Sequence, residues 1–493
     1  MPAALAPPLD AGSRVGVWGR VGQTMHIFDT SSKVTLEERR AADGLDAYVP
    51  RILYDGELYD ADVDRFFLDL PLNGVRSRHS LRAYGYDIMV WLRFLTEVCD
   101  KTVWGAARAD VVVFHRIRRR GEPGSRISAS SWNRSIAAID KLYEWGVREG
   151  LLPSSPFSHR EIWRRNRTRG QGRLVTRNGA FEGRANQNTI RFVTLEAFRQ
   201  FRDVGLRGLT ADGAERPGAR DRNGLRNVLF AELLVVTGLR LEEASFLLAF
   251  ELDALPAANA SRGQTWLNLP AGLTKGERGR AILIPDDLIH RLRTYVRVER
   301  AHAVTKFKAR QGWDLVERPI LVRRPSAGSG NLSLLDGRAV PLEVFSPEER
   351  GRLVICEADN TPIEPAVLWL TEVGQPVRPN SWEVAFARAC QRCQANGFPI
   401  DISPHQLRHT FAVHMLAMLI QRQLGRRSLE SSAGPAEGYR RILGDPLQQV
   451  QRLLGHASLE TTSIYLDHIA TRADTVDTAV AELLALLPGG GRL

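Results

Sequence analysis

An arginine-rich stretch without apolar periodicity, residues 159–191, divides the chain into two long regions. Its arginines are interspersed with Gly, Asn and Thr, a composition typical of a solvated connector rather than of a packed element. The chain has 493 residues, which is too long for one ordinary domain, and each flanking region is long enough to bury a core of its own. We therefore expect at least two domains joined by a basic linker over 159–191.

The region before the linker is predicted to be helical over residues 56–158. In one stretch apolar residues recur every three or four positions, at Leu81, Tyr84, Ile88, Trp91, Leu92 and Leu95. A second stretch repeats the pattern at Trp132, Ile136, Ile139, Leu142 and Tyr143. Residues 1–55 are punctuated by Pro, Gly and Asp and show only weak periodicity, so we expect an irregular N-terminal arm there.

The region after the linker, residues 192–473, predicts a larger mixed domain. Thr194 is a candidate N-cap, and a later apolar helix is expected to end at Gly238. The strand-like runs TWLNLP and RAILIP flank AGLTKGERG, as in a β-hairpin. The predicted fold is mainly α with a small β-hairpin or sheet: a helical domain followed by a mixed α+β domain.

Three further segments of this region stand apart from the predicted core. Residues 300–362 and 421–446 look like insertions because mixed polarity and Pro/Gly interrupt the helical patterns. Residues 474–493 are expected to form an amphipathic C-terminal helix and tail. Its apolar stripe consists of Val476, Val480, Leu483, Leu484 and Leu487.

The charge balance favours a polyanionic partner. The formal net charge is +11, carried mostly by arginines spread along the chain. A charge run is most often a solvated face, but a basic connector in a basic protein also suits DNA. The candidate DNA-binding residues of the linker are Arg164, Arg165, Arg167, Arg169 and Arg173.

Other compositional signals narrow the class of protein. Neither a signal-peptide pattern nor an apolar run of membrane-spanning length is present, so we expect a soluble cytoplasmic protein without membrane contact. Four cysteines provide no disulfide framework. Cys390 and Cys393 form a lone CxxC, which indicates packing rather than a metal site, and we expect no metal.

Two candidate catalytic side chains lie near the ends of predicted elements. Arg240 follows a helix-ending glycine in TGLRLEEASFL, and Glu243 lies one turn further on. Lys275 lies in the predicted hairpin turn LTKGERG. Alone, such an arginine is usually a surface residue and such a lysine a solvated turn residue. Neither signal is specific by itself.

A third candidate segment is ISPHQLRHTF. Ser403, Pro404 and Gln406 supply an N-cap, an N1 proline and a capping-box partner, so a helix is predicted to begin there. His405 and Arg408 then share one face of the first turns, where free N–H groups and the helix dipole favour an anion. The HxxR spacing is weak evidence, since it also occurs at residues 79 and 82 without an assigned role.

A fourth segment, LLGHASLETTSIYLDH, contains His456 and, nine positions later, Tyr465. Ser458 is a candidate N-cap, which would place Tyr465 within a helix. A tyrosine in such a place is usually a core or surface aromatic.

In this order, the four segments resemble the tyrosine recombinase, or phage integrase, family, including its Xer-type enzymes. The resemblance covers roughly residues 192–468, and the helical region before it more loosely resembles the family's core-binding domain. TGLRLEEASFL is similar to the family's first arginine box, the hairpin lysine to its catalytic lysine, HQLR to its HxxR box and LLGHASLETTSIYLDH to its final box. The resemblance implies a catalytic set of Arg240, Lys275, His405, Arg408, His456 and the nucleophile Tyr465, with Glu243 in support.

The resemblance also implies a mechanism and partners. Two arginines would neutralise a DNA phosphate while the tyrosine attacks it and remains joined to the 3′ phosphate, without metal, ATP or another cofactor. His405 would accept the phenol proton and Lys275 would protonate the departing 5′ oxygen. The enzyme would work on double-stranded DNA as a homotetramer that exchanges C-terminal helices between protomers.

Other functions remain open alternatives. A type IB topoisomerase or a telomere resolvase resembles this family in the same catalytic set. A catalytically idle DNA-binding regulator would keep the fold and charge, although a pure binder has no need of Tyr465. A metal-dependent transposase is disfavoured, because the sequence offers no clear trio of carboxylates for two ions.

Overall fold

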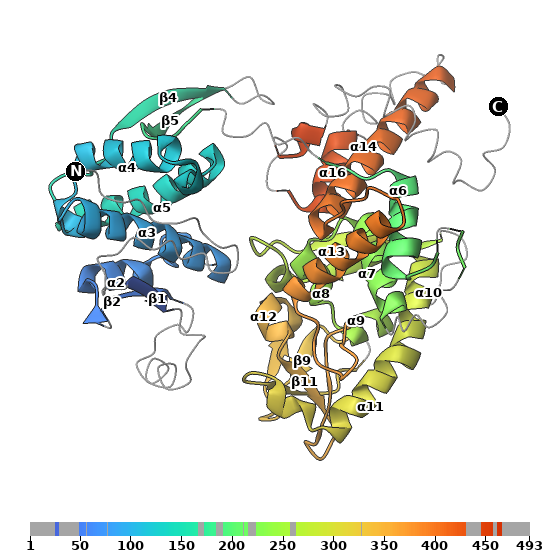
Figure 1. Cartoon of the computed structure of the whole chain (residues 1–493). Helices are drawn as coiled ribbons and strands as arrows, with labels where there is room; N and C mark the ends of the chain where they lie inside the picture. Colours follow the sequence, from blue (N-terminus) through green and yellow to red (C-terminus); the bar gives the residue numbers. More distant parts are fainter. Residues whose placement is uncertain are drawn as a thin grey trace, which may run out of the picture. The chain divides into compact units, whose positions relative to one another are not determined.

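The computed structural model describes residues 25–28, 49–55, 57–75, 77–165, 172–183, 191–210, 212–214, 223–256, 263–326, 328–429, 445–456 and 461–465. The chain divides into two compact units, Met1–Asn188 and Thr189–Leu493. Helices dominate both units and the sheets are small (Figure 1). This confirms the predicted fold class, mainly α with small β elements.

Four helices form the body of the first unit: α2 (Ala61–Asp69), α3 (Arg78–Val98), α4 (Arg108–Arg120) and α5 (Ala129–Arg148). The apolar stripes predicted from the sequence lie on α3 and α5 and meet in a shared aromatic core. The Trp91 indole donates a hydrogen bond of 2.8 Å to the Tyr143 hydroxyl, which in turn donates to the Val103 carbonyl. The polar atoms of these buried aromatics are therefore satisfied, as burial requires.

A small sheet precedes these helices. Strands β1 (Met25–Phe28), β2 (Arg51–Tyr54) and β3 (Glu57–Leu58) pair in that order, antiparallel throughout. The prediction of an irregular arm over residues 1–55 is therefore wrong for β1 and β2. Strands of four residues are too short to display an alternation that stands out in the sequence.

The predicted linker over 159–191 contains a β-hairpin, so the prediction of a structureless connector is wrong there. Strand β4 (His159–Arg165) pairs antiparallel with β5 (Gly172–Asn178). Trp163 lies opposite Leu174, and these side chains are 66% and 50% exposed. In each strand the two apolar residues are consecutive, at 162–163 and 174–175, so the sequence lacks the alternation by which half-buried strands are recognised.

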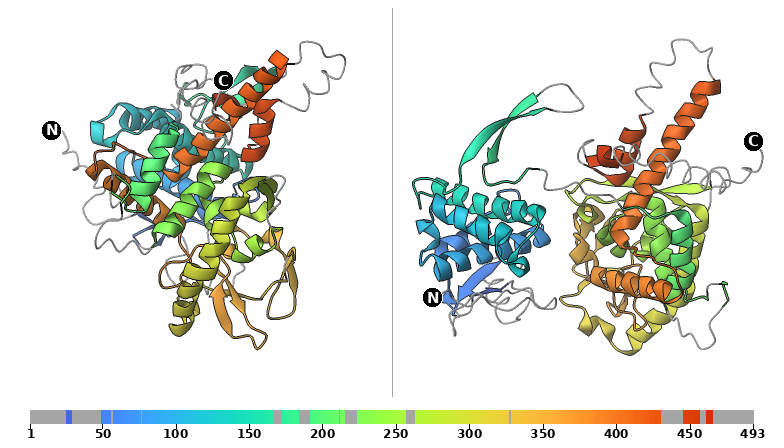
Figure 2. Two further views of the ribbon diagram at one scale, coloured as in Figure 1. Left: turned by 90° about the vertical axis from the view of Figure 1, so that its right-hand side faces the viewer. Right: turned by 45° about the horizontal axis from the view of Figure 1, so that its top comes forward.

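The hairpin is fixed to the first unit at its base and extends as a ribbon above α4 and α5 (Figures 1 and 2). His159 Nε2 lies 2.9 Å from an Asp140 carboxylate oxygen on α5. On the other strand, the Asn178 side chain is buried and accepts a hydrogen bond from the Ala180 N–H. Trp132 of α5 donates to the Ala180 carbonyl just after this strand, and residues 166–171 lie outside the described part of the chain.

The second unit is built mainly from helices around one core. Its helices are α6 (Leu195–Gln200) with its continuation η4 (Phe201–Leu206), α7 (Gly224–Thr237), α8 (Leu241–Ser245), α9 (Ala249–Asp253), α10 (Asp286–Tyr295), α13 (Pro379–Ala395), α14 (Pro404–Leu429) and α16 (Pro446–Leu454). Thr194 caps α6 as predicted, because its side chain accepts the Ala197 N–H. Phe230 of α7 stacks on Trp382 of α13 at 3.7 Å between ring centroids, deep in this core.

The predicted hairpin of the second unit is present. Strands β6 (Gln264–Leu269) and β7 (Arg280–Pro285) pair antiparallel and flank the turn that contains Lys275. Helix α7 ends at Gly238 as expected, with φ +65 and a left-handed conformation. A Cβ at this position would lie 2.3 Å from Phe411 of α14, so both the backbone angle and the space require glycine.

The predicted insertion near 300–362 forms a packed subdomain of the second unit. It contains η6 (Val296–Arg300), α11 (Ala301–Ala309), β8 (Ile320–Arg323), β9 (Asn331–Ser333), β10 (Ala339–Pro341), α12 (Pro347–Arg350), β11 (Leu353–Cys356) and β12 (Pro362–Pro365). The sheet order is β12-β11-β8. Two buried ion pairs of 2.6 Å stabilise this subdomain. Arg300 pairs with Glu364 within the subdomain, and Arg350 pairs with Glu251 of α9. In the other predicted insertion, residues 430–444 lie outside the described part of the chain.

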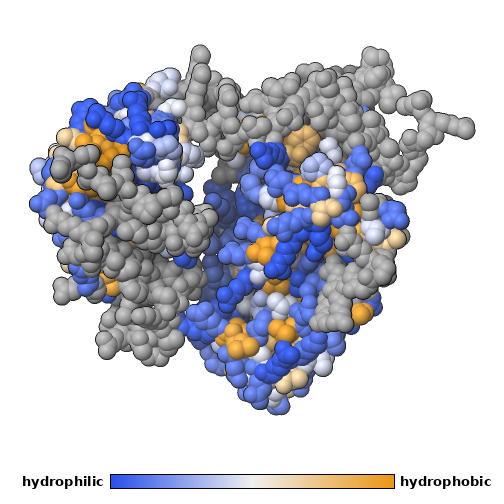
Figure 3. Space-filling view, viewed as in Figure 1, coloured by the Kyte–Doolittle hydropathy of each residue, from blue (hydrophilic) through white to orange (hydrophobic). Residues whose placement is uncertain are grey.

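The described surface of the second unit is mainly hydrophilic on the face shown in Figure 3, with small, separate apolar patches. Within the described residues, no helix is both long enough and apolar enough to cross a membrane. The predicted C-terminal helix over 474–493 lies outside the described residues, as does the N-cap candidate Ser458.

Candidate active site

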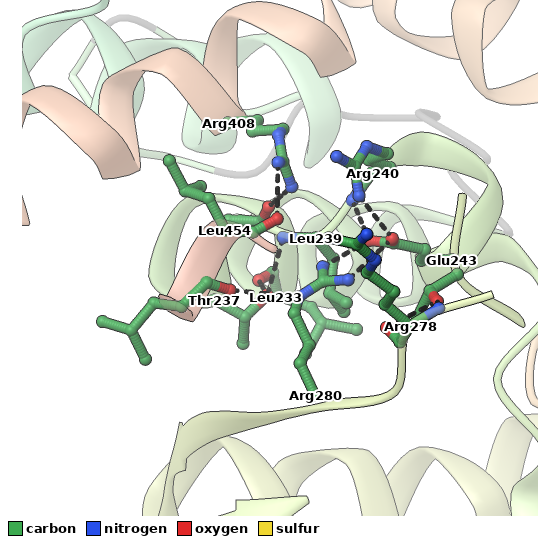
Figure 4. A network of polar contacts seen from close by, with 12 residues as sticks. Leu233, Thr237, Leu239, Arg240, Glu243, Arg278, Arg280, Arg408 and Leu454 are labelled. Atoms are coloured by element: carbon green, nitrogen blue, oxygen red, sulfur yellow. Dashed lines mark hydrogen bonds and ion pairs between the residues drawn. The ribbon is translucent and has the colours of Figure 1, made fainter. Parts of the chain in front are cut away.

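A buried carboxylate between two arginines is the central ionic feature of the second unit. Glu243 of α8 is only 2% exposed, and its Oε1 accepts from Arg240 at 2.8 Å and from Arg280 at 2.9 Å. Its Oε2 accepts from Arg280 at 2.6 Å and from the Arg240 backbone N–H at 2.8 Å. Figure 4 shows both guanidinium groups turned toward this carboxylate. Glu243 therefore holds Arg240 by its side chain and by its backbone N–H.

The charge state of this cluster follows from its contacts. Burial alone would raise the pKa of the Glu243 carboxyl, but hydrogen bonds and charge from Arg280, and then the charge of Arg240, lower it to about 2. The group is therefore ionised at neutral pH. Arg240 remains 27% exposed, so its guanidinium can still reach a ligand.

Arg408 is held by carbonyl oxygens at the ends of two helices. Its guanidinium donates to the Gly238 oxygen at 2.5 Å and to the Leu454 oxygen at 2.7 Å (Figure 4). The residue is 3% exposed. Gly238 follows α7 and Leu454 ends α16, and the carboxyl ends of helices carry partial negative charge that favours a cation. The fold thus places a buried arginine close enough to Arg240 for their charges to interact.

Helix α14 begins as predicted and presents the histidines of the site. The Ser403 N–H donates to the Gln406 side chain at 2.6 Å, and the Gln406 N–H donates to the Ser403 hydroxyl, which completes the capping box. His405, in the first turn, is solvent-exposed. Partial desolvation, followed by the charges of Arg408 and Arg240, lowers its pKa, so its imidazole is neutral at neutral pH.

Tyr465 lies in a helical segment at 461–465 and is 2% exposed. Its hydroxyl lies 3.0 Å from Nδ1 of His409, one turn after His405 on α14. Burial raises the pKa of the Tyr465 phenol, while the charges of Arg408 and then Arg240 act to lower it. The proposed nucleophile therefore lies within the electrostatic reach of both proposed phosphate-binding arginines.

His456 belongs to the same cluster. Its ring is nearly parallel to that of Tyr465, with centroids 6.1 Å apart and an interplanar angle of 13°. Its Nδ1 lies 3.0 Å from the Thr462 hydroxyl. Burial, followed by the charges of Arg408 and Arg240, lowers its pKa to about 3. Such a neutral imidazole can donate one hydrogen bond and accept another.

Lys275 and the linker arginines are not among the residues that make these contacts. Lys275 is exposed in the β6–β7 turn and is not part of the polar network in Figure 4. In the linker, Arg164 is directly opposite Arg173 in the ladder of β4 and β5. Arg165 is the last residue of β4. The other two candidate arginines, at 167 and 169, lie outside the described residues.

Sequence reasoning missed two residues of the cluster as site components. Arg280 was not among the predicted site residues, yet its side chain is 7% exposed and binds both oxygens of Glu243. His409 received no role, although it directly follows Arg408. The signal available in the sequence was the four-residue spacing of His405 and His409, which places both rings on one helix face.

Possible metal ligands among the described residues gather elsewhere. Asp140, Glu144 and His159 bring one ligand atom each within 4.8 Å of one another in the first unit. Ion pairs of 2.9 and 3.7 Å between His159 and the two carboxylates account for this arrangement. The Cys390 and Cys393 thiols are buried and contact backbone carbonyls of Ile402 and Gln200, as packed cysteines do.

Comparisons with known proteins find similarity to recombinases. Residues 63–150 match the model of the phage integrase N-terminal SAM-like domain. Tyrosine recombinase XerC of Mycobacterium bovis is 24% identical over 414 residues, which cover 83% of this chain and 94% of the relative. Tyrosine recombinase XerD of Mycobacterium tuberculosis is 24% identical over 390 residues, which cover 78% and 86%.

A crystal structure of the XerH site-specific recombinase bound to a palindromic difH substrate has 13% identity and a TM-score of 0.45, covering 85% of this chain and 84% of that one. That likeness is too weak to support an inference. The matched helical region and the two relatives, which align over most of their length, carry the identification: the chain belongs to the tyrosine recombinase family.

Proposed function

We propose that this tyrosine recombinase cuts and rejoins double-stranded DNA at a specific site through a covalent bond between Tyr465 and a 3′ phosphate. The observation that supports the proposal most directly is the contact of the Tyr465 hydroxyl, 3.0 Å from Nδ1 of His409, on the helix that also carries Arg408. Arg408 in turn donates to the carbonyl of Gly238, two residues before Arg240. A nucleophile and two anion-binding groups are thus gathered at one place, as in-line attack on a phosphodiester requires.

The arginines are the groups that would neutralise the phosphate. Negative charge grows on the non-bridging oxygens as the phenol oxygen adds, and a guanidinium can donate two hydrogen bonds to them while remaining charged. Arg240, braced by Glu243, and Arg408, braced by two helix-end carbonyls, would grip the phosphate. His405 and His456 would hydrogen-bond the same group.

The departing 5′ oxygen needs a proton, because an alkoxide is a poor leaving group. Lys275, exposed in the β6–β7 turn, would supply it. The phosphotyrosine bond keeps the energy of the broken phosphodiester, so another 5′ hydroxyl can reseal the strand without ATP. No step of this scheme calls for a metal ion.

The basic hairpin of β4 and β5 would bind DNA together with the net charge of +11. A two-stranded ribbon fits the major groove, and arginines recur along both strands. We also propose that the enzyme acts as a homotetramer with exchanged C-terminal helices, and that it works in the cytoplasm.

Two alternatives have less support. A topoisomerase or telomere resolvase would share the catalytic set, but the model match at 63–150 is to a phage integrase domain. An idle DNA-binding regulator would not need Tyr465 close to two arginines.

Trapping on nicked suicide substrates tests the proposal. Nicked duplexes tiled across the DNA that flanks the gene are incubated with the full chain, and covalent adducts are resolved on denaturing gels. Wild type is expected to form an adduct that EDTA leaves unchanged, while Tyr465→Phe forms none but binds DNA as before. An adduct from Tyr465→Phe, or loss of activity on chelation that magnesium restores, would contradict the proposal.

A further inference from the structure

The contact between Tyr465 and His409 indicates a role for His409, a residue that the sequence alone did not single out. We propose that His409 is a catalytic residue: its Nδ1 holds the Tyr465 hydroxyl and accepts the phenol proton as the oxygen attacks the phosphate. This inference rests on the proposed function and replaces His405 with His409 as the proton acceptor.

Geometry provides the first argument. The distance of 3.0 Å between His409 Nδ1 and Tyr465 Oη is that of a hydrogen bond, and a general base must lie within this reach of the proton it removes. With the ring proton on Nε2, Nδ1 accepts and the hydroxyl donates. His405 is exposed, and its ring centroid lies 4.4 Å from that of His409. His405 is therefore placed to meet the DNA phosphate rather than the buried hydroxyl.

Packing provides the second argument. Tyr465 is buried in a cluster with Phe411, Leu416, Val450 and Leu454, so bulk water has little access to its hydroxyl. A buried hydroxyl needs a protein partner for its proton, because leaving it unpaired costs the desolvation penalty. His409 provides that partner from α14, the helix that also carries Arg408.

The charges around His409 keep it ready to accept a proton. Burial, followed by His405 and Arg408, lowers the pKa of His409 to about 4, so the ring is neutral before DNA binds. A DNA phosphate brings negative charge beside the same cations, which raises the pKa of His409 and favours proton uptake at the moment of attack. The structure around the ring thus couples its basicity to the presence of substrate.

The step balances as follows. The Oη–H bond of Tyr465 breaks and its proton moves to His409 Nδ1, while the Oη–P bond forms and the P–O5′ bond breaks. The 5′ oxygen takes a proton, which the proposed function assigns to Lys275. Resealing reverses each transfer, so His409 returns its proton to Tyr465 and no co-reactant is needed.

The decisive variant is His409→Asn in the full chain. The Asn side-chain oxygen can accept a hydrogen bond near the position of Nδ1 but cannot take up a proton. We expect adduct formation on the nicked substrates to slow by about 100-fold or more, within the range of general-base effects. A fluorinated tyrosine at position 465, whose phenol loses its proton more easily, should speed up His409→Asn far more than it speeds up wild type. The matched control is His290→Asn, an exposed histidine of α10.

The pH profile separates proton transfer from positioning. Wild-type cleavage should fall at low pH as His409 becomes protonated, and this limb should disappear in His409→Asn, whose rate should rise with pH as the phenol ionises by itself. A His409→Asn enzyme with the wild-type rate and profile would overturn the inference. Equal melting temperatures of the variants guard against a folding defect as the cause of a slow rate.

A measurement without DNA keeps the two proposals distinguishable. In the full chain with 15N-labelled histidine, the Nδ1 resonance of His409 should shift when Tyr465→Phe removes the hydroxyl. If wild type forms no adduct, the proposed function fails, while this shift still reports on the hydrogen bond. A His409 resonance that does not respond to Tyr465→Phe would overturn the inference even in an active enzyme.

Discussion

Replacing Arg280 tests how much the positions of Glu243 and Arg240 depend on a residue that is not proposed to contact the substrate. Arg280→Ala deletes both hydrogen bonds to the Glu243 carboxylate and the one to the Leu453 carbonyl at the end of α16. Glu243 is then left buried with Arg240 as its remaining partner among the ion pairs that the described residues show. We expect both stability and cleavage to fall, because Arg240 depends on Glu243 for its position.

The size of the effect can be worked out from the carboxyl group. The pKa of Glu243 falls from its usual 4.5 to about 2, which corresponds to about 3 kcal/mol of stabilisation of the carboxylate. Arg280 accounts for the larger share, since its contributions rank ahead of that of Arg240. Removing one member of a buried ion pair typically costs about 3–5 kcal/mol. We therefore expect Arg280→Ala to lower the unfolding free energy of the second unit by about 2–4 kcal/mol.

Urea unfolding at pH 7 measures this change, with hydrogen exchange of peptides from α7 and α8 assigning the transition to the second unit. Arg278→Ala is the matched control, because Arg278 is exposed in the turn just before β7 and bonds to the Thr274 hydroxyl through its backbone N–H and carbonyl. Its expected change is within about 0.5 kcal/mol. Equal losses in the two variants would refute the reasoning.

The pH dependence gives a second test of the same idea. A lowered pKa stabilises the folded state only while the carboxylate is ionised, so the contribution is complete above pH 4.5 and is lost as the pH falls through about 2. The difference in stability between wild type and Arg280→Ala should therefore shrink below pH 4.5. A difference that stays constant down to pH 2 would mean that Glu243 is not its source.

Three further outcomes are expected. Arg240→Lys and Arg408→Lys should each lower the rate of adduct formation by about 100-fold or more, since an ammonium lacks the forked geometry, and near-normal rates in both would remove them from the site. Lys275→Ala should cleave a substrate with a bridging 5′ sulfur almost as fast as wild type, because sulfur leaves without a proton, and failure of that rescue would assign the acid elsewhere. Deleting the chain after Ala473 should spare binding to a single site but weaken synapsis on native gels, whereas unchanged assembly would place the terminal helix on its own subunit.

Local signals in the sequence predicted the framework of the site well. The capping box at Ser403 and the left-handed glycine at 238 are short-range features, because the groups that satisfy each other lie within one or two turns. They predicted where α14 begins and where α7 ends, and therefore at which helix ends Arg408 and Arg240 lie. Helical periodicity likewise predicted the core of the first unit.

Contacts between distant residues could not be predicted in the same way. Glu243 and Arg280 are 37 positions apart, and His409 and Tyr465 are 56 apart, so no local spacing links either pair. The β4–β5 hairpin was not predicted, for a different reason. Its strands pair through the backbone, and its apolar residues are consecutive, at 162–163 and 174–175, so the sequence shows no apolar-polar alternation.

The buried arginines of the site are balanced by helix ends before any DNA is present. Carbonyls at Gly238 and Leu454 accept from Arg408, and the Leu453 carbonyl accepts from Arg280. Both helices, α7 and α16, stop at a left-handed glycine, which exposes their last carbonyls and their negative dipole ends toward the site. These carbonyls satisfy guanidinium N–H donors but neutralise the charge of Arg408 only in part, because each carries less than a unit charge.

A phosphate supplies the full negative charge that the carbonyls lack. The arrangement is therefore stable enough to fold without substrate and still electropositive enough to bind an anion, which is the condition for a preorganised site. The Arg280 side chain packs closely against Gly455, the residue that ends α16. The φ of Gly455 is +64, and a Cβ there would lie 2.8 Å from the Arg280 side chain. The turn that ends α16 thus helps to set the position of Arg280, through it that of Glu243, and finally that of the partly exposed Arg240.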